Sequence, residues 1–523
     1  MLHTKLPLED TKAFTPFFLD YIRQKESLKP FYHSFPSPDN FNNLLTIKGK
    51  AFPQANRAVL QAALAHQYRG LKPSEKVRAN IAALADPGTF TVTTGHQLNI
   101  FTGPLYFIFK IVTVINTCRS LKEKYPQCNF VPVYWMASED HDYDEIKYFR
   151  LYGKKYVWET DQHGAVGRFD TKGIENILNE VPGDTGIFRE AYQKNRKLSD
   201  AVRHYVNSLF GQEGLIALDA DDRNLKLLFR DVMKEDILQN TTFPMVEKTN
   251  KQLETLGYEP QIFCRDINFF YLEDQVRSRI EKDGDRYKVL DTSLVFSGEE
   301  MAALIESNPE KFSPNVILRP LYQEMILPNL AYVGGPAELV YWLQLKNVFE
   351  HHRVPFPILM PRNFGMIVDH PLNRKFEKTG LEMSILFEPK NYIFNHWVLK
   401  NTKHDMTVGQ ERATVETTFR NLQGKASSID HTLAAFVGAE GRRALNSLEK
   451  IEKKMLRAEK RLHADRLRQI EEVKDTLFPG TGLQERVDNF LNFYQQDDQF
   501  IGKLIHHFDP FDFSFNILTY GNR

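Results

Sequence analysis

Two short apolar runs each end in a cluster of polar residues and are separated by a longer apolar segment with helical spacing. The first run, residues 90–94, is β-branched and aromatic and ends at 95–97, while the second, residues 130–137, ends at 138–142. The segment between them begins near Gly103, and its apolar residues recur every three to four positions. This pattern predicts a strand, a helix and a second strand. Because ligands bind beyond the carboxyl ends of parallel strands, both polar clusters are expected to face one cavity.

Apolar and polar stretches divide the whole chain into six predicted segments of an α/β protein. Sheet-like runs lie on both sides of 175–310, so we interpret this segment as an insertion into one nucleotide-binding fold; within it, 215–218 is a further strand candidate. The segments are an N-terminal helical segment (1–88), the first half of the core (89–174), the inserted connecting region (175–310), the second half of the core (311–409), an antiparallel coiled coil (410–478) and a C-terminal segment that packs back on the body (479–523).

The coiled coil is predicted from a change in composition near residue 410. Proline disappears from there to about 477 and charged residues become frequent. Three-to-four spacing of apolar residues is typical of a coiled-coil seam. The residues with this spacing are Leu448, Ile451, Met455, Ala458 and Leu462. A partner helix is predicted over 413–437, with the turn at the glycines of 438–441, which gives an antiparallel helical hairpin.

The composition argues against several classes of binding partner and of cellular location. The chain has 523 residues, of which 42% are hydrophobic, and its 67 Lys and Arg balance 67 Asp and Glu. This balance gives no support for a nucleic-acid or membrane-surface partner. Its three cysteines have the spacing of neither a disulfide framework nor a zinc ribbon, and no run of about 18 apolar residues is present. We expect a cytoplasmic protein that is neither secreted nor membrane-spanning.

The residues that follow the second predicted strand are candidate acids and bases. They are Glu139, Asp140, His141 and Asp142. Several like charges at the end of an apolar strand are costly to bury unless a cation or hydrogen-bond donors compensate them. One interpretation is a catalytic site that holds a Mg²⁺-nucleotide or an ammonium group, with His141 available for proton transfer. The other is a solvated acidic turn that caps the next helix.

The cluster after the first strand is a candidate anion site. It consists of Gly95, His96, Gln97, Thr102 and Gly103. A flexible backbone with polar donors ahead of a helix N-terminus attracts phosphate or carboxylate. The stretch has neither the Walker A nor the dinucleotide glycine pattern, and it is weakly similar to the His-containing first signature of class I aminoacyl-tRNA synthetases. The alternative is a structural turn in which His96 serves as a cap.

Two later clusters are further binding candidates. Their residues are Arg319, Gln323, Asn329, Tyr332, Gly334, Gly335 and Glu338 in the first cluster, and Arg362 in the second. The side chains suit a polar substrate and Arg362 suits phosphate or carboxylate, although Gly-Gly-Pro at 334–336 equally allows a tight turn. The adjacent His351 and His352 are expected on different faces of a helix, so no metal site is predicted.

Five stretches together resemble the BshC family, the cysteine-adding ligases of bacillithiol biosynthesis. The stretches are Gly95-His96-Gln97, TGPLY at 102–106, WMASEDHD at 135–142, Arg319-Pro320 and LPNLAYVGGP at 327–336. The two longest strings are specific, and the order of all five, with the late coiled coil, spans nearly the whole chain. His96 departs from the Gln that the family often carries, so the resemblance assigns no catalytic role to that imidazole.

The resemblance implies a Rossmann-type core and a coiled coil used in homodimerisation. It also implies a reaction in which the carboxylate of cysteine is joined to the amine of glucosaminyl-malate. ATP or another nucleotide, with Mg²⁺, would activate the carboxylate as an adenylate or an acyl phosphate, and no prosthetic group is expected. In our hypothesis, 95–97 and Thr102 hold phosphate or the activated carboxylate, and Glu139 to Asp142 orient the amines or assist deprotonation. The competing hypotheses are a non-catalytic scaffold of the same fold and a nucleotidyltransferase-type ligase acting on another amine.

Overall fold

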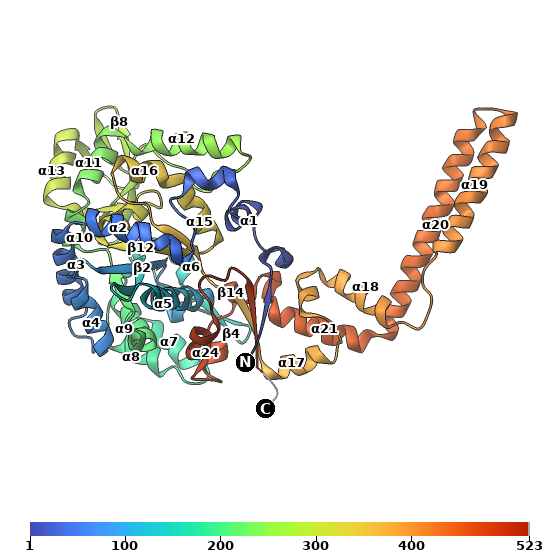
Figure 1. Ribbon diagram of the computed structural model, residues 1–523, viewed down its shortest axis with the longest axis horizontal. Helices are drawn as coiled ribbons and strands as arrows, with labels where there is room; N and C mark the ends of the chain where they lie inside the picture. Colours follow the sequence, from blue (N-terminus) through green and yellow to red (C-terminus); the bar gives the residue numbers. More distant parts are fainter. Residues whose placement is uncertain (521–523) are drawn as a thin grey trace. The chain divides into compact units, whose positions relative to one another are not determined.

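The computed structural model describes residues 1–520 and divides them into two compact units (Figure 1). The first unit comprises Met1, His3–Met366 and Gly482–Leu518. The second comprises Leu2, Ile367–Thr481 and residues 519–520. Within residues 1–520, no helix combines the length and apolar character needed to cross a membrane.

The first unit is built around a five-stranded parallel sheet in the order β13-β12-β2-β3-β6. Its strands are β2 (Thr89–His96), β3 (Asn129–Met136), β6 (Ile216–Asp219), β12 (Asn329–Gly334) and β13 (Ile358–Pro361). Successive strands are added on one side of β2 up to β6, and the next strand, β12, then pairs with the other side of β2. The fold class predicted from the sequence is therefore confirmed, with the topological switch point of a Rossmann-type sheet between β2 and β12.

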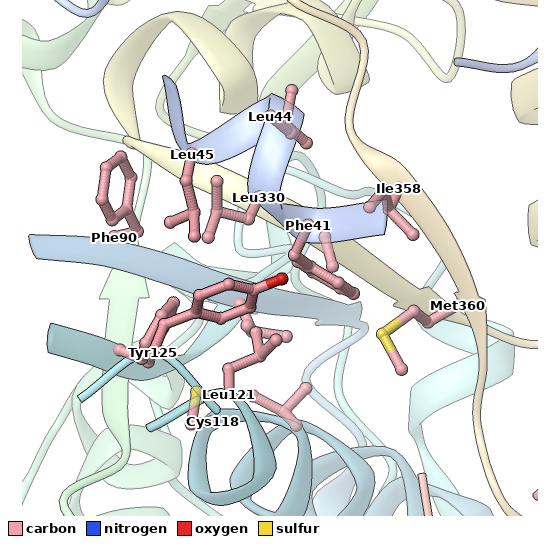
Figure 2. Close-up of a cluster of buried hydrophobic side chains, with 14 of the residues drawn as sticks. Phe41, Leu44, Leu45, Phe90, Cys118, Leu121, Tyr125, Leu330, Ile358 and Met360 are labelled. Carbon is pink, nitrogen blue, oxygen red and sulfur yellow. The ribbon is translucent and has the colours of Figure 1, made fainter. Parts of the chain in front are cut away.

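The sheet forms where the sequence places β-branched and aromatic residues. Every residue of β2 except Gly95 is buried, and in β3 only Asn129 is exposed, which is typical of strands covered on both faces. The helix α5 (Tyr106–Lys124) connects them and completes the predicted strand–helix–strand unit. Figure 2 shows side chains of α2 (Phe41–Ala51), α5 and the strands meeting in one buried cluster, in which Phe41, Leu121 and Leu330 are fully buried.

The prediction for 175–310 is wrong in one respect, because this segment is not wholly an insertion. Its short strand β6 pairs in parallel with β3 and is the outer strand of the core sheet. A separate antiparallel sheet, in the order β10-β9-β8-β7-β11, begins later in the segment and ends beyond it. Its strands are β7 (Phe269–Glu273), β8 (Val276–Asp283), β9 (Arg286–Val289), β10 (Val295–Ser297) and β11 (Phe312–Pro314).

Helices and short sheets complete the first unit. The other strands are β1 (Leu2–Leu6), β15 (Phe515–Thr519) and β14 (Phe364–Val368), in the order β1-β15-β14, and the hairpin β4 (Tyr148–Leu151) and β5 (Lys154–Val157). The other helices are α1 (Pro16–Ile22), α3 (Gln54–Gln67), α4 (Glu75–Ala83), α6 (Tyr143–Ile146), α7 (Ile174–Glu180), α8 (Gly186–Lys194), α9 (Leu198–Phe210), α10 (Arg223–Leu227), α11 (Arg230–Gln239), α12 (Thr242–Thr255), α13 (Gly298–Ser307), α14 (Arg319–Ile326), α15 (Pro336–Trp342), α16 (Lys346–His351), α22 (Gln484–Val487), α23 (Leu491–Tyr494) and α24 (Phe500–His507).

The second unit is helical. It contains α17 (His370–Glu377), α18 (Lys390–Asn401), α19 (Gly409–Ile429), α20 (Leu433–Leu462) and α21 (Ala464–Leu477). It begins at Ile367 rather than near 410, because α17 and α18 belong with α21. Lys390 of α18 binds Glu471 at 3.1 Å and Asp475 at 2.7 Å on α21.

The helices α19 and α20 form the predicted antiparallel hairpin, but the predicted turn at 438–441 is wrong (Figure 1). The chain turns at 430–432, where the Asp430 carboxylate accepts hydrogen bonds from the amide and hydroxyl of Thr432. Gly441 lies inside α20, and a Cβ there would be only 2.9 Å from the Cβ of Phe419 on α19. This glycine therefore permits close packing of the two helices.

A buried ion pair ties α2 to the core sheet. Lys48 Nζ lies 2.9 Å from Glu324 Oε2, and the two side chains are 1% and 0% exposed. Glu324 also accepts a hydrogen bond from Asn329, whose own side-chain oxygen accepts from the hydroxyls of Thr91 and Thr93 on β2. A buried charge of this kind depends on its partner, because either group alone would remain desolvated and uncompensated.

We expect Lys48→Met to lower the free energy of unfolding of the first unit by about 3–5 kcal/mol, because it leaves Glu324 buried without a cation. Urea unfolding checks this. The matched control is Lys29→Met, which removes a solvent-exposed pair with Glu26 and should leave the midpoint unchanged. Equal midpoints for the two variants would contradict the importance of the buried pair.

Candidate active site

The carboxyl ends of the five parallel strands place the predicted polar clusters along one edge of the core sheet. His96 ends β2 opposite Met136 of β3, which in turn lies opposite Asp219 at the end of β6. On the other side of β2, Gly334 of β12 lies opposite Pro361 of β13. The side chains at this edge form two groups, which differ in charge.

The first, which we call the switch-point group, consists of Gly95, Lys110, Arg319, Tyr332 and Glu338. Lys110 of α5 is 2% exposed, and its Nζ donates to the Gly95 carbonyl at 2.9 Å and to Glu338 Oε1 at 2.5 Å. The other carboxylate oxygen of Glu338 accepts from the Tyr332 hydroxyl at 2.8 Å. Burial lowers the pKa of Lys110, although Glu338 opposes this shift. Lys110 therefore joins the end of β2 to the helix that follows β12.

Arg319 has donor capacity that the protein leaves unused. Its Nη1 donates to Gln323 Oε1 at 3.2 Å and the guanidinium also interacts with the Tyr341 hydroxyl, but among residues 1–520 its buried Nη2 has no hydrogen-bond partner. The guanidinium lies beside the rings of Trp135 and Tyr332, at 5.9 and 5.5 Å from their centroids. An unsatisfied buried donor is costly, so an acceptor supplied by an anionic ligand would be stabilised there.

The glycines at this edge permit close approach of side chains. A Cβ on Gly95 would lie 3.2 Å from the Tyr332 hydroxyl, and one on Gly334 would lie 2.9 Å from Leu339. A Cβ on Gly335 would lie 3.5 Å from Glu338 Oε1. Gly95 and Gly334 are therefore closely packed by neighbouring side chains, whereas the contact of Gly335 is an ordinary one.

His96 is buried between aromatic rings. Its ring centroid is 5.3 Å from that of Tyr106 and 5.1 Å from that of Phe107, and no group among residues 1–520 is a hydrogen-bond partner of its Nε2. Burial, together with the nearby charges of Lys110 and Arg362, places the pKa of His96 well below its usual value. The imidazole is therefore neutral at physiological pH.

Arg362 lies next to the switch-point group but is largely paired. Its Nη2 lies 2.6 Å from Glu485 Oε1 and its Nη1 donates to the Asn363 carbonyl at 2.9 Å. The Arg362 Nε is buried without a hydrogen-bond partner. Sequence reasoning missed Glu485, which comes from a segment more than a hundred residues further along the chain.

The second, which we call the acidic group, consists of Glu139, Asp219 and Asp221 with the cations Arg168 and Lys226. The buried Lys226 Nζ lies 2.7 Å from Glu139 Oε1 and 3.1 Å from Asp221 Oδ1, while Arg168 Nε lies 2.7 Å from Asp221 Oδ2. Burial raises the pKa values of Glu139 and Asp219. Burial also opposes ionisation of Asp221, but Lys226 and Arg168 lower its pKa to about 2.

Of the other predicted acid and base residues, Asp140 and Gln97 are brought together. Gln97 Nε2 donates to Asp140 Oδ2 at 3.0 Å and also to Glu145. His141 is half exposed and contacts Arg277 of β8, and burial together with that arginine lowers its pKa. Arg277 Nη1 also lies 3.9 Å from Asp140. Asp142 is exposed.

Two adjoining cavities open beside these residues. One has a volume of about 540 Å³ and is lined by Ser138, Arg168, Lys197, Asp219 and Asp221, among others. The other has a volume of about 650 Å³, and its lining includes His141, Asp142 and Arg277. Both share Gln162, His163, Phe169 and Gln275. Their volumes are those of sites for small polar metabolites.

The structure separates several predicted residues from this edge. Asn329 lies at the opposite end of β12, and both its side-chain atoms are hydrogen-bonded inside the protein. Gln323 bonds Arg319 and Glu324. At the start of α5, the Leu105 amide already donates to the Asp488 carbonyl at 2.7 Å, and Asn489 binds the carbonyl of Gly103. The Thr102 hydroxyl is buried there without a hydrogen-bond partner.

Several residues of the site were missed, although some carried a signal. Asp219 and Asp221 follow the strand candidate 215–218 directly, so the strand-end rule that selected Glu139 also applies to them. Lys110 is a lone charge within an apolar helical segment, which often indicates a buried and paired side chain. Arg277 lies in a strand of the antiparallel sheet, and nothing in its local sequence connects it to Asp140.

Comparison with known proteins identifies the family. Residues 1–363 match the model of the BshC N-terminal Rossmann-like domain of bacillithiol biosynthesis, and 365–520 match the BshC C-terminal coiled-coil domain. The chain belongs to the BshC family. Relatives named "Putative cysteine ligase BshC" occur in Christiangramia forsetii, at 40% identity with 98% of each chain covered, and in Cytophaga hutchinsonii, at 39% with 99% of this chain and 98% of the relative covered. The one in Bacillus licheniformis is 28% identical and covers 92% of this chain and 94% of its own.

A solved structure from Campylobacter jejuni, titled as a "putative arginyl t-RNA synthetase", aligns with 80% of this BshC-family chain and 99% of its own. Its identity is 8% and its TM-score is 0.21, so the likeness carries no argument about fold or function.

In this member of the BshC family, Lys226→Met should destabilise the first unit more at pH 8 than at pH 5. Without Lys226, the folded-state pKa of Glu139 rises further above its unfolded value, so the folded state binds more protons than the unfolded state and stability falls as pH rises. We expect a deficit of about 3–5 kcal/mol at pH 8 and a smaller one at pH 5. Urea midpoints at the two pH values measure it.

The control for this pH dependence is Lys147→Met, which removes an exposed pair with Asp144. Its difference from the unmodified protein should be the same at both pH values. A deficit in Lys226→Met that does not change with pH would mean that Glu139 is compensated by another group.

Proposed function

We propose that this chain is an amide-forming ligase that joins the carboxylate of cysteine to the amine of glucosaminyl-malate, with a nucleotide activating the carboxylate. Family membership over the whole chain supports the class of reaction. The observation that carries the proposal is the pairing of two chemically opposite groups along one sheet edge: a cationic group with unused donors and an acidic group beside a cavity. A ligase needs both, since it must hold an anionic activated acid and a basic amine together.

The switch-point group suits the nucleotide phosphates and the carboxylate. Within residues 1–520, Arg319 Nη2 of this group and Nε of the neighbouring Arg362 are buried donors without partners, and Lys110 adds a positive charge that Glu338 pairs. Phosphate or carboxylate oxygens would satisfy these donors and gain charge-assisted hydrogen bonds. The position agrees with the general rule that ligands bind at the switch point of an open parallel sheet. These residues suit either ATP or another nucleotide, and the activated carboxylate is either an adenylate or an acyl phosphate.

The carboxylates beside Gln97 suit the Mg²⁺ that accompanies a nucleotide. Asp140 and Glu145 both accept hydrogen bonds from the Gln97 amide, so their oxygens converge on one point. Oxygen ligands of this kind are those that Mg²⁺ prefers. When bound, the ion would neutralise phosphate charge, and Asp140 and Glu145 are the residues that would hold it.

The acidic group suits the amine substrate. An ammonium entering the cavity of about 540 Å³ meets the carboxylates of Asp219 and Asp221, while Arg168 and Lys197 on the same wall suit the malate carboxylates. The amine must lose a proton before its lone pair attacks the activated carbon. Asp219, whose pKa burial raises, and the neutral His141 are the candidate acceptors. The C–N bond then forms as the phosphate-bearing leaving group departs.

Asp140→Asn and His141→Ala should each lower ligation of cysteine to glucosaminyl-malate by about 10²-fold, because the first removes a carboxylate that would hold Mg²⁺ and the second removes a positioned proton acceptor. The assay follows nucleotide-dependent consumption of both substrates and bacillithiol formation in cells that lack their native copy. The control is Asp144→Asn, an exposed carboxylate close by in the sequence. Unchanged bacillithiol formation at normal protein levels would remove Asp140 and His141 from the mechanism.

Arg319→Lys should lower kcat/KM for the nucleotide at least tenfold, because it keeps the charge but loses the unused second donor. The same assay, run at varied nucleotide concentration, checks this. Arg223→Lys, at an exposed site, is the control. If the unmodified chain neither binds a nucleotide nor consumes the two substrates, a scaffold function is favoured. Nucleotide-driven modification of another amine would instead indicate a different ligase.

We also propose that the hairpin of α19 and α20 mediates a homodimer. Large apolar side chains are exposed on both helices: Leu422, Ile429, Leu433, Phe436, Ile451 and Leu462. Large apolar side chains exposed along a helical hairpin favour burial against a second copy. We expect Ile429→Lys combined with Phe436→Lys to yield a monomer in sedimentation analysis. If the double variant remains a dimer, the dimer interface lies outside this hairpin.

A further inference from the structure

Two adjacent histidines and a glutamate meet away from the candidate active site. Glu235 comes from α11, His351 is the last residue of α16, and His352 follows it. The Nε2 of His351 lies 2.9 Å from Glu235 Oε2, and the Nδ1 of His352 lies 3.9 Å from the same oxygen. One ligand atom from each of the three residues lies within 4.8 Å of the other two.

The expectation that His351 and His352 point to different faces of a helix is wrong, because the helix ends between them. Arg353 has a left-handed backbone with a φ of 54°, and the Val354 amide donates back to the Phe349 carbonyl. This C-terminal motif turns the chain out of the helix. The two imidazole rings consequently lie edge to face, with centroids 4.7 Å apart and planes at 87°.

We propose that Glu235, His351 and His352 bind a divalent transition metal ion of the Zn²⁺ type. In a tetrahedral zinc site with bonds of about 2.0–2.2 Å, neighbouring ligand atoms are about 3.3–3.5 Å apart. The separations of 2.9 and 3.9 Å lie on either side of that value, so small side-chain rotations bring the atoms into place. Two imidazoles and one carboxylate are a known zinc ligand set, with water in the fourth position.

Burial and charge support a metal at this place. The side chain of His352 is 8% exposed, and burial lowers its pKa although Glu235 opposes the shift. A neutral imidazole does not have to lose a proton before it coordinates. The Nδ1 of His352 is the ring nitrogen that faces Glu235, so it is the atom that would coordinate the ion. His351 and Glu235 are partly exposed, which leaves a path from solvent.

The site would serve structure rather than ligation. His352 precedes β13 and borders a cavity of about 190 Å³ together with Lys48 and Glu324, at the edge of the sheet opposite the carboxyl ends of the strands. Glu235 belongs to a helix between β6 and β12, whereas the histidines lie between β12 and β13. A bound ion would therefore link two separate connections of the core, and the inference is independent of the proposed ligase activity.

The test uses the full chain, stripped with a chelator and titrated with Zn²⁺ by calorimetry and with Co²⁺ by visible absorption. We expect one equivalent to bind, with the visible bands of four- or five-coordinate Co²⁺, and a rise in the unfolding temperature of the first unit. Glu235→Gln and His351→Ala should each weaken binding at least tenfold. The control is His66→Ala, which removes an exposed histidine from α3.

Each result of this test either supports or overturns the proposed metal site. Weakening in Glu235→Gln and His351→Ala but not in His66→Ala supports the site. Equal binding in all variants means that the ion sits elsewhere and overturns the proposal, as does the absence of binding to the unmodified chain. If His351→Ala fails to fold, Glu235→Gln decides alone, because it keeps the size of the side chain and removes only the charged ligand.

Discussion

Parallel pairing of β2 with β3 on one side and β12 on the other is the constraint on which the rest of the structure depends. It brings strand ends from distant parts of the chain to one edge, and it places the switch point between β2 and β12. Polar side chains gathered at a buried edge must be compensated. Lys110 and Lys226 each supply that compensation, the first for Glu338 and the second for Glu139 and Asp221.

Some charged side chains along the edge are fully paired within the protein and others are not, and the incompletely paired ones indicate where a ligand binds. Lys226 is fully occupied by its two carboxylates and the Glu310 carbonyl, so the acidic group is stable without a substrate. In the described part of the chain, Arg319 and Arg362 each keep one buried donor without a hydrogen-bond partner. Buried donors without acceptors at the switch point lower the stability of the folded protein, and an anion that binds to them restores that stability. The cationic half of the edge is therefore the half prepared for charged ligands, whereas the acidic half borders open cavities.

The sequence predicted the parts of the fold that have a local signal. The unit β2–α5–β3 and the hairpin of α19 and α20 follow from apolar spacing, and the family resemblance rests on strings that lie in or beside the strands. Pairing over long distances has no such signal. The apolar run of β6 was recognised, but nothing in four residues tells which strand it joins, so Asp219 was left outside the site. Arg277 and Glu485 reach the edge only through tertiary packing.

The glycines at the sheet edge and in α20 have roles that depend on the side chains packed against them. Gly95 suggested a flexible backbone for phosphate and Gly334 a tight turn, yet a Cβ on Gly334 would lie only 2.9 Å from Leu339, and one on Gly95 would lie 3.2 Å from the Tyr332 hydroxyl. Gly441 suggested a turn and instead admits Phe419. In both places the glycine is required by what lies over it. Packing at this edge of the sheet therefore accounts for the glycines, and the chemistry belongs to the side chains that the packing positions.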